Sequence, residues 1–194
     1  MTDMAEATRH GSHAHWAWGS ATPERLALME IVVHGIEREI AGKDVVDLGP
    51  GDGSITKILA KHARKVYAVD SDRELNSLLA KNCADIKNIV PVPSDSRRMA
   101  LDDSSVDVVF SSSSFHDLPE GYEREIARVL RDGGTTIVFD WKRVRTEFGP
   151  PMQIRLDAKT VEKRFAAVGL IKIMEKGYGT HYLLVFRKPK IANA

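Results

Sequence analysis

The sequence predicts an α/β fold, a Rossmann-like three-layer sandwich around a seven-stranded, mostly parallel sheet with an antiparallel C-terminal hairpin. Three observations predict it. From residue 43 onward, short apolar strands alternate with amphipathic helical segments, which is typical of parallel sheets covered by helices on both faces. A glycine-rich loop directly follows the first of these strands. The last two strands are separated only by residues 176–179, too few for a crossover helix, so they form a hairpin.

The composition is that of an ordinary globular protein. The chain has 194 residues, which suits one domain (1–194) with a substantial core. A formal net charge of +1 supplies no electrostatic argument for nucleic acid or an anionic membrane as a partner. No apolar run approaches the roughly 18 residues that span a bilayer, and no signal-peptide pattern opens the chain. We expect a cytoplasmic protein, and the sequence leaves its oligomeric state open.

The N-terminal segment, residues 1–22, contains three histidines and two tryptophans, Trp16 and Trp18, without a helical or strand period. No carboxylate or cysteine partner recurs near the histidines, so we expect no metal site there. We expect a flap or tail whose tryptophans form a mobile cover over the acceptor side of a ligand pocket.

A long amphipathic helix is predicted over residues 23–41. Thr22 is a favourable N-cap, and Pro23 suits the first helical position. Apolar residues then recur at three- and four-residue steps from Leu26 to Ile40. Gly42 ends the helix.

The predicted cofactor-binding core covers residues 43–187, where strands and helices alternate. Its strands are expected at 44–48, 66–70, 88–92, 106–111, 135–140, 170–175 and 180–187. Its helices are expected at 54–62, 72–81, 119–130 and 157–168, with a short helical or irregular piece at 96–101.

The first strand leads into the glycine-rich loop. Glycine permits a tight turn there and lets a ligand approach the backbone without meeting a Cβ atom. The spacing is G-x-G-x-G and not the G-x-G-x-x-G of dinucleotide folds. A carboxylate here would repel a pyrophosphate but suit an ammonium group, so the loop favours S-adenosylmethionine over NAD. The candidate cofactor-binding residues are Asp47, Gly49, Pro50, Gly51, Asp52 and Gly53. A glycine-rich turn without any nucleotide is the alternative.

Polar residues after the other parallel strands extend this site, because ligands bind at the carboxyl ends of strands in open α/β sheets. Asp70 ends the second strand about 20 residues past the loop, where an acidic side chain can accept hydrogen bonds from both ribose hydroxyls. Ser94, Asp95 and Ser96 follow the third strand, and the Asp95 carboxylate is a candidate acceptor for the adenine amine. An Asx turn at Asp95 is the alternative. Ser111 ends the fourth strand.

These motifs resemble those of the class I S-adenosylmethionine-dependent methyltransferases. The subgroup that they resemble is methyltransferase type 11, which includes the ubiquinone and menaquinone C-methyltransferases. The chain departs from the fourth motif at Asp117, where a second histidine is common, and has Arg131-Asp132 where Lys-Pro is common. No particular acceptor is therefore implied. The matching segments are residues 47–53, 69–70, 94–96, 107–118 and 125–134.

The resemblance implies a role for each candidate. Asp47 and Asp52 would lie near the cofactor's ammonium group, Asp70 would hold the ribose, and Ser94, Asp95 and Ser96 would meet adenine. Ser111 would border the sulfonium and the carboxylate. On the acceptor side, His116 and Asp117 are the candidate catalytic residues, and Asp140 is a further titratable group. The alternatives are a helix-entry role for His116 and a helix-cap role for Asp117.

The implied activity is methyl transfer to a small-molecule acceptor by in-line displacement, in which the enzyme mainly positions the two reactants. A nicotinamide-dependent Rossmann oxidoreductase is one alternative, disfavoured by the missing G-x-G-x-x-G spacing and by the terminal hairpin. A non-catalytic domain that retains the methyltransferase fold is the other.

Overall fold

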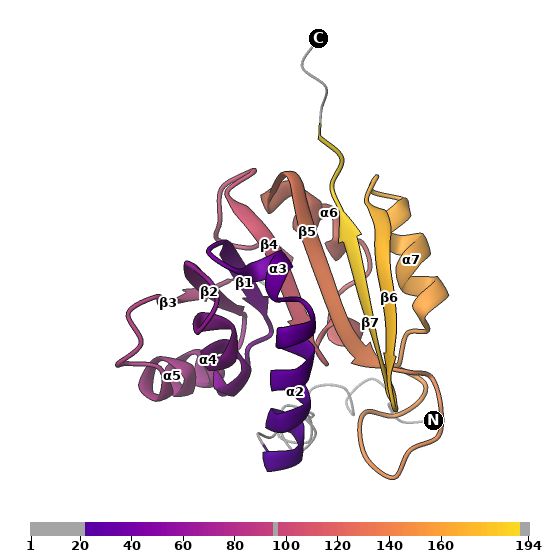
Figure 1. Cartoon of the computed structure of the whole chain (residues 1–194), viewed down its shortest axis with the longest axis horizontal. Helices are drawn as coiled ribbons and strands as arrows, with labels where there is room; N and C mark the ends of the chain where they lie inside the picture. The colour runs from indigo at the N-terminus through magenta and orange to yellow at the C-terminus, as the bar shows by residue number, and fades with distance from the viewer. Residues whose placement is uncertain (1–21, 95–96, 191–194) are drawn as a thin grey trace, which may run out of the picture.

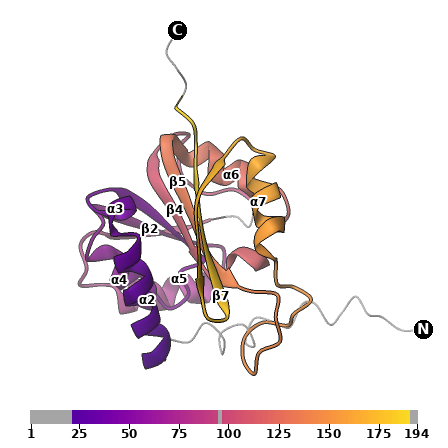
Figure 2. The ribbon, with the colours of Figure 1, turned by 45° about the vertical axis from the view of Figure 1, so that its right-hand side comes forward.

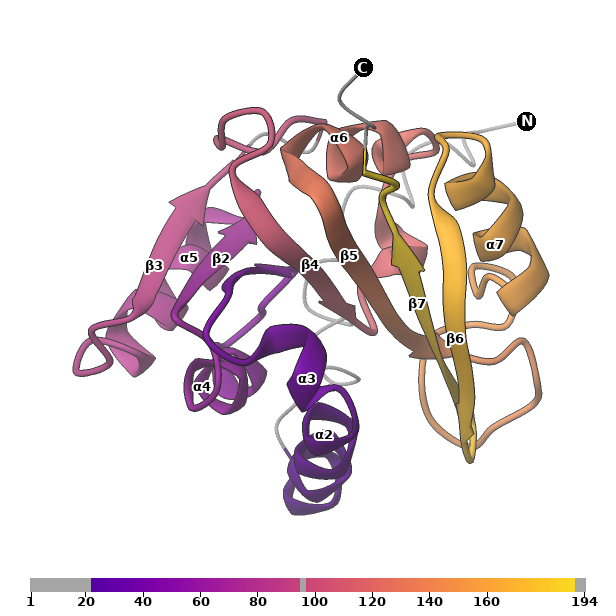
Figure 3. The ribbon, with the colours of Figure 1, turned by 45° about the horizontal axis from the view of Figure 1, so that its top comes forward.

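The computed structural model describes residues 22–94 and 97–190. The expected flap therefore lies outside the described residues, apart from Thr22, as do Asp95 and Ser96 on the predicted adenine side. Seven strands form one sheet in the order β3-β2-β1-β4-β5-β7-β6, which Figure 3 shows from one edge to the other. The strands are β1 (Asp44–Leu48), β2 (Lys65–Asp70), β3 (Ile89–Pro93), β4 (Val106–Ser112), β5 (Leu130–Trp141), β6 (Ile171–Tyr178) and β7 (His181–Arg187).

The strand directions confirm the predicted sheet. β1 pairs in parallel with β2 and β4, β2 with β3, and β4 with β5. β7 runs antiparallel to both β5 and β6, so the last two strands form the expected hairpin. The fold is thus the mostly parallel, three-layer α/β sandwich that the sequence predicts.

Helices cover both faces of the sheet, and Figure 2 shows the two helical layers on opposite sides of it. One apolar cluster joins α2, α4 and α5 to the inner side chains of the strands on one face. The second joins α6 and α7 to the other face. The helices are α2 (Pro23–Gly35), α3 (Glu37–Ile40), α4 (Ser54–Ala60), α5 (Arg73–Asn82), α6 (Tyr122–Val129) and α7 (Ala158–Ala166), with the 3₁₀ helix η1 (Phe115–Asp117) before α6.

The N-terminal helix begins as predicted but is not continuous. The Thr22 hydroxyl caps it by accepting a 3.2 Å hydrogen bond from the Arg25 amide. Ile36, with φ −118° and ψ 15°, separates α2 from α3, so the prediction of one helix over 23–41 was wrong at this point. Gly35 weakens the helix locally, and the bend still leaves both Ile36 and Ile40 buried.

The fifth strand starts earlier than predicted. Leu130 already pairs with Val106, and the register then shifts, so that Val108 faces Thr135. Gly133 lies within this irregular stretch with φ +80°, as is typical of a β-bulge. The predicted helix over 119–130 is correspondingly shorter in the structure.

Pairing of the parallel strands brings the candidate residues to one edge of the sheet. Leu48, the last residue of β1, is opposite both Val69 of β2 and Ser111 of β4. The loop after β1 therefore lies between the ends of β2 and β4. Figure 1 shows α2 extending down past this lower edge of the sheet, and Arg25 in its first turn contacts Ser112 at the end of β4.

Candidate functional site

The loop after β1 has a closed side and an open side. Gly49, Gly51 and Gly53 have φ of +73°, +58° and +85°, in the left-handed region that favours glycine. The Gly49 amide donates a 3.0 Å hydrogen bond to the Val69 carbonyl, which ties the loop to β2. A Cβ atom on Gly49 would lie 2.6 Å from the Cβ of Ser114, whereas one on Gly51 would have no described atom within 4 Å. The open side at Gly51 is where a ligand can approach the backbone.

The two acidic residues of the loop region are held by neighbouring side chains and amides. Asp47 is 1% exposed, and its Oδ2 accepts a 2.7 Å hydrogen bond from the Thr56 hydroxyl. Burial raises the pKa of Asp47 to about 7, against the opposing effect of that hydrogen bond. The Asp52 carboxylate accepts from the Ser54 amide at 3.0 Å and from the Ser54 hydroxyl at 2.9 Å. Asp47 is therefore a buried acid whose ionised form a nearby cation would stabilise.

The end of β2 presents an oriented carboxylate. Asp70 Oδ1 accepts a 3.0 Å hydrogen bond from the Asp72 amide, and the Ser71 amide also interacts with this carboxylate. Burial is the largest influence on Asp70 and raises its pKa. Ser94 lies beside it, because the Ser94 amide donates to the Asp70 carbonyl at 2.8 Å. The Ser94 hydroxyl accepts from the Ala100 amide at 3.0 Å and so closes the turn after β3.

The turn after β4 packs directly against the glycine loop. Ser111 is 2% exposed, and its hydroxyl lies 2.8 Å from the Ser114 hydroxyl. The Ser114 hydroxyl donates a 2.7 Å hydrogen bond to the Leu48 carbonyl. Ser113 has φ +53°, which turns the chain back over the loop. Ser111 and Gly49 thus belong to one continuous surface.

A buried histidine–carboxylate pair follows this turn. His116 Nδ1 lies 2.8 Å from Asp140 Oδ1, and both side chains are almost fully buried. The His116 amide also donates to Asp140 Oδ2, and the Trp141 amide to Asp140 Oδ1. Burial lowers the pKa of His116, but the Asp140 hydrogen bond and the charges of Asp140 and Asp117 outweigh it, so the pKa is raised. The backbone donors orient Asp140, and Asp140 orients the imidazole.

The structure bears on one of the two roles considered for Asp117, the helix cap. Asp117 Oδ2 lies 3.4 Å from His116 Nε2. The helix α6 begins at Tyr122, with Gly121 in the N-cap position. The alternative that Asp117 caps this helix was therefore wrong, and its carboxylate faces the imidazole.

Two residues that the sequence analysis did not single out lie at the same edge. The Arg25 guanidinium of α2 contacts the hydroxyls of Ser112 and Ser113. His181, the first residue of β7, pairs with Trp141 at the end of β5, and their rings are 4.0 Å apart. Burial, followed by the charge of Arg25, lowers the pKa of His181 to about 4. The antiparallel direction of β7 was the available signal for His181, because such a strand begins where its parallel neighbour ends.

The loop after β5 is organised around one buried arginine. Arg155 is 4% exposed, and its guanidinium lies 4.9 Å from the Trp141 ring centroid. Each of its three nitrogens donates to this loop, four of the acceptors being backbone carbonyls. The loop after β5 thus has an internal support at this edge of the sheet. The Arg155 acceptors are the carbonyls of Lys142, Val144, Phe148 and Pro150 and the hydroxyl of Thr146.

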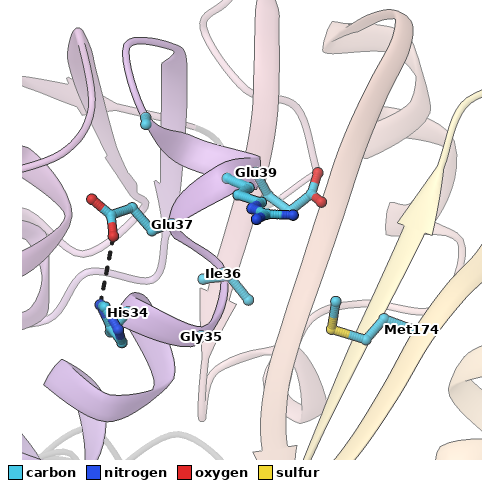
Figure 4. Close-up of a pocket in the computed structure, with 8 residues that line it drawn as sticks. His34, Gly35, Ile36, Glu37, Glu39 and Met174 are labelled. Carbon is cyan, nitrogen blue, oxygen red and sulfur yellow. Dashed lines mark ion pairs between the residues drawn. The ribbon is translucent and has the colours of Figure 1, made fainter.

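A separate groove of about 510 Å³ lies at the bend between α2 and α3. Figure 4 shows His34 and Glu37 pointing toward each other, 3.5 Å apart, with Met174 of β6 on the opposite wall. Because α3 leads into the amino end of β1, the groove lies at the opposite end of that strand from the glycine loop. It is lined by His34, Gly35, Ile36, Glu37, Arg38, Glu39, Ala41 and Met174.

Within residues 22–94 and 97–190, no group of three or more His, Cys, Asp or Glu side chains is arranged to hold a metal ion. Among the helices described, none combines the length and apolar character needed to cross a membrane.

Comparisons with known proteins agree with this geometry. The methyltransferase domain family matches residues 46–138. An uncharacterized methyltransferase of Mycobacterium tuberculosis is 36% identical over 95 residues, which are 48% of this chain and 38% of the relative. A ribosomal RNA small subunit methyltransferase A of Mycoplasmopsis pulmonis is 33% identical over 66 residues, covering 34% of this chain and 26% of the relative. The matches therefore span well under half the length of these relatives.

A solved methyltransferase structure has the same fold. The crystal structure of an S-adenosylmethionine-dependent methyltransferase from Aquifex aeolicus superposes with a TM-score of 0.79 at 24% identity, covering 86% of this chain and 93% of that one. The domain match covers the glycine loop, Asp70 and Ser111, the residues that the structure brings to one edge of the sheet. Residues 46–138 thus match the methyltransferase domain family, and the chain shares the fold of an S-adenosylmethionine-dependent methyltransferase.

Proposed function

We propose that this chain binds S-adenosylmethionine at the carboxyl ends of β1, β2 and β4 and transfers its methyl group to a small-molecule acceptor. The proposal rests on one observation: hydrogen bonds join the ends of β1, β2 and β4 to one another. The glycine loop is hydrogen-bonded to the end of β2 through Gly49 and to the turn after β4 through Ser114. A ligand lying across this edge would contact all three segments at once.

The residues present fit the parts of this cofactor. The open side at Gly51 leaves room for the amino-acid portion beside the backbone. Asp47, with its raised pKa, would gain a favourable partner in an ammonium group. The Asp70 carboxylate, oriented by backbone amides, suits two ribose hydroxyls. We propose the same adenine-side role for Ser94, Asp95 and Ser96 as the family resemblance implies.

When bound, the cofactor would supply a methyl group activated by a positively charged sulfur. The contribution of the chain is then to hold the two reactants at an attacking distance in line. The turn at Ser111 would border the reacting sulfur, and His116 would face the acceptor. If Nδ1 carries the proton and donates a hydrogen bond to the Asp140 carboxylate, Nε2 is the basic nitrogen of the imidazole. For an acceptor that carries a proton, His116 Nε2 would take it, with Asp117 alongside.

Isothermal titration tests the cofactor assignment. S-adenosylmethionine and its demethylated product are expected to bind at one site per chain, and NAD far more weakly. Fluorescence titration with reduced nicotinamide would detect the oxidoreductase alternative. Failure of both S-adenosyl ligands to bind at high micromolar concentration would contradict the proposal.

A screen with radiolabelled methyl donor tests the acceptor. The small-molecule assignment is supported by a net charge of only +1, which offers little attraction for a polyanion. The relative from Mycoplasmopsis pulmonis is a ribosomal RNA methyltransferase, so ribosomal RNA belongs in the same screen. Label transferred to RNA alone would replace the small-molecule assignment. Cofactor binding without transfer to any acceptor would favour the non-catalytic alternative.

The pair of His116 and Asp140 predicts a pH dependence of stability. The pKa of His116 is raised in the folded protein. Protonated His116 therefore stabilises the fold fully below a pH of about 6.5, the pKa of histidine in the unfolded chain. This stabilisation is lost as the pH rises through the folded pKa. Above the pKa of about 7 of Asp47, thermal unfolding should therefore show a decline that Asp140→Asn reduces, since the hydrogen bond and charge of Asp140 are the largest influences that raise the His116 pKa. His34→Gln, at an exposed histidine, is the control that should keep the decline. An unchanged decline in Asp140→Asn would contradict the pairing.

A further inference from the structure

The loop between β5 and α7 has a charged group inside it and apolar side chains outside. Its interior holds the buried Arg155. Of the seven large apolar side chains that are exposed among the described residues, four lie in this loop, and Phe148 is the most exposed of all at 75%. A soluble surface gathers few such side chains in one segment, and their gathering is typical of a binding surface. The four are Val144, Phe148, Met152 and Ile154.

The packing inside the loop keeps these side chains at the surface. The Arg155 guanidinium donates to the Val144 carbonyl at 2.8 Å and to the Phe148 carbonyl at 3.3 Å. The backbone of both residues is therefore fixed from within, while both side chains are exposed. The Trp141 ring lies against Arg155 on one side and so close to Gly149 that a Cβ there would be 2.8 Å away. A guanidinium and an indole thus fill the space into which the apolar side chains would otherwise turn.

The surface of the same loop carries an excess of positive charge. Arg143 and Arg145 are exposed on either side of Val144. Up to Ile154, the loop has three cations, Lys142 among them, and one carboxylate, that of Glu147. The net charge of the whole chain is only +1, so this excess is a local feature. Cations beside exposed apolar side chains complement an anionic lipid surface, whose phosphates attract the cations and whose acyl boundary accepts the apolar groups.

The loop also projects from the molecule. Figures 1 and 2 show it, in orange, extending past the ends of β5, β6 and β7. It begins directly after Trp141, and the preceding residue is Asp140, the partner of His116. A flat surface that contacts this loop would therefore lie against the same edge of the sheet as the candidate site.

We propose that the loop after β5 binds the surface of an anionic lipid bilayer. Phe148 and its apolar neighbours enter the headgroup region, and Arg143 and Arg145 pair with lipid phosphates. A fluid bilayer adapts to apolar side chains spread along a loop, whereas a protein partner has to match their shape. The inference goes beyond the proposed function, because lipid binding is measured without cofactor or acceptor.

Sedimentation of the full chain with lipid vesicles tests this surface. The chain should bind vesicles of phosphatidylglycerol and phosphatidylcholine in equal amounts more tightly than vesicles of phosphatidylcholine alone, and added salt should weaken the binding. Phe148→Ser should weaken binding to the anionic vesicles by about tenfold. Arg143→Gln and Arg145→Gln together should weaken it by roughly twentyfold at low salt.

The matched control for Phe148→Ser is Ile171→Ser. Ile171 is 59% exposed at the start of β6, where it pairs with Arg187, whereas the loop follows Trp141, which pairs with the opposite end of β7. The control for the double arginine variant is Arg38→Gln with Lys87→Gln. Both cations are exposed and lie near the amino ends of β1 and β3, away from the loop. Both controls should keep wild-type affinity for the anionic vesicles, and the melting temperature should be unchanged in all four variants.

Three results would overturn the inference. These are no binding to either kind of vesicle, equal binding to both kinds, and equal losses in the loop variants and their controls. Analytical ultracentrifugation identifies the competing occupant, a second copy of this chain. Self-association that Phe148→Ser abolishes, in a chain that does not bind vesicles, would assign the loop to that contact instead.

Discussion

Asp70→Ala should weaken binding of S-adenosylmethionine by about tenfold to several hundredfold. Hydrogen bonds to a charged group are each worth about 1.5–3 kcal/mol, and each 1.4 kcal/mol is a factor of ten. The carboxylate is already oriented by the Asp72 amide, so the ribose would bind a preformed acceptor. The cofactor affinity of Asp70→Asn should lie between those of the wild-type protein and Asp70→Ala, because the amide keeps one acceptor and loses the charge. Isothermal titration of the three proteins measures the series.

The stability of these variants separates a binding role from a structural one. Because burial raises the pKa of Asp70, its ionised form costs stability in the ligand-free protein at neutral pH. Asp70→Asn should therefore keep or raise the melting temperature.

Asp72→Ala is the matched control. The Asp72 side chain caps α5 by accepting from the amides of Glu74 and Leu75. Its loss should cost about 1 kcal/mol of stability and leave cofactor affinity intact.

Wild-type cofactor affinity in Asp70→Ala would show that the assignment of Asp70 to the ribose is wrong.

Gly49→Ala should destabilise the protein and impair cofactor binding together. The left-handed backbone alone costs an alanine roughly 1–2 kcal/mol. The new Cβ would also lie 2.6 Å from Ser114 Cβ and 2.8 Å from its hydroxyl, displacing the turn that is bound to Leu48. We expect a loss of at least about 2 kcal/mol, or a fall in melting temperature of roughly 4–8 °C for a domain of this size. Thermal unfolding and titration with S-adenosylhomocysteine on the same variant measure both effects.

Gly51→Ala provides the comparison for Gly49→Ala. Gly51 has a similar positive φ, but no described atom lies within 4 Å of its added Cβ. Gly51→Ala should lose only the stability that a left-handed backbone costs an alanine. Its methyl group would enter the space proposed for the ligand and weaken binding. Equal destabilisation by the two alanines would mean that the contact with Ser114 is not what requires glycine at position 49.

The sequence alone determined the architecture and the strand ends that carry the site. Alternation of apolar strands with helices and the short 176–179 connection are local patterns, and they led correctly to the parallel sheet and its terminal hairpin. The rule that ligands bind at the carboxyl ends of parallel strands then located Gly49, Asp70 and Ser111 at one edge. The break at Ile36 escaped this reasoning, because an apolar periodicity continues across a bend that keeps the same face buried.

Only the tertiary structure decided which groups face one another across this edge. The partnership of His116 with Asp140, and the contacts of Arg25 with Ser112 and Ser113, join residues far apart in the chain. Such contacts depend on strand order, side-chain direction and burial, which no local pattern encodes. The raised pKa of Asp47 likewise follows from burial beneath the loop and not from its place in the motif. The motifs therefore predicted where a ligand would bind, and packing decided the charges and hydrogen bonds that it would meet.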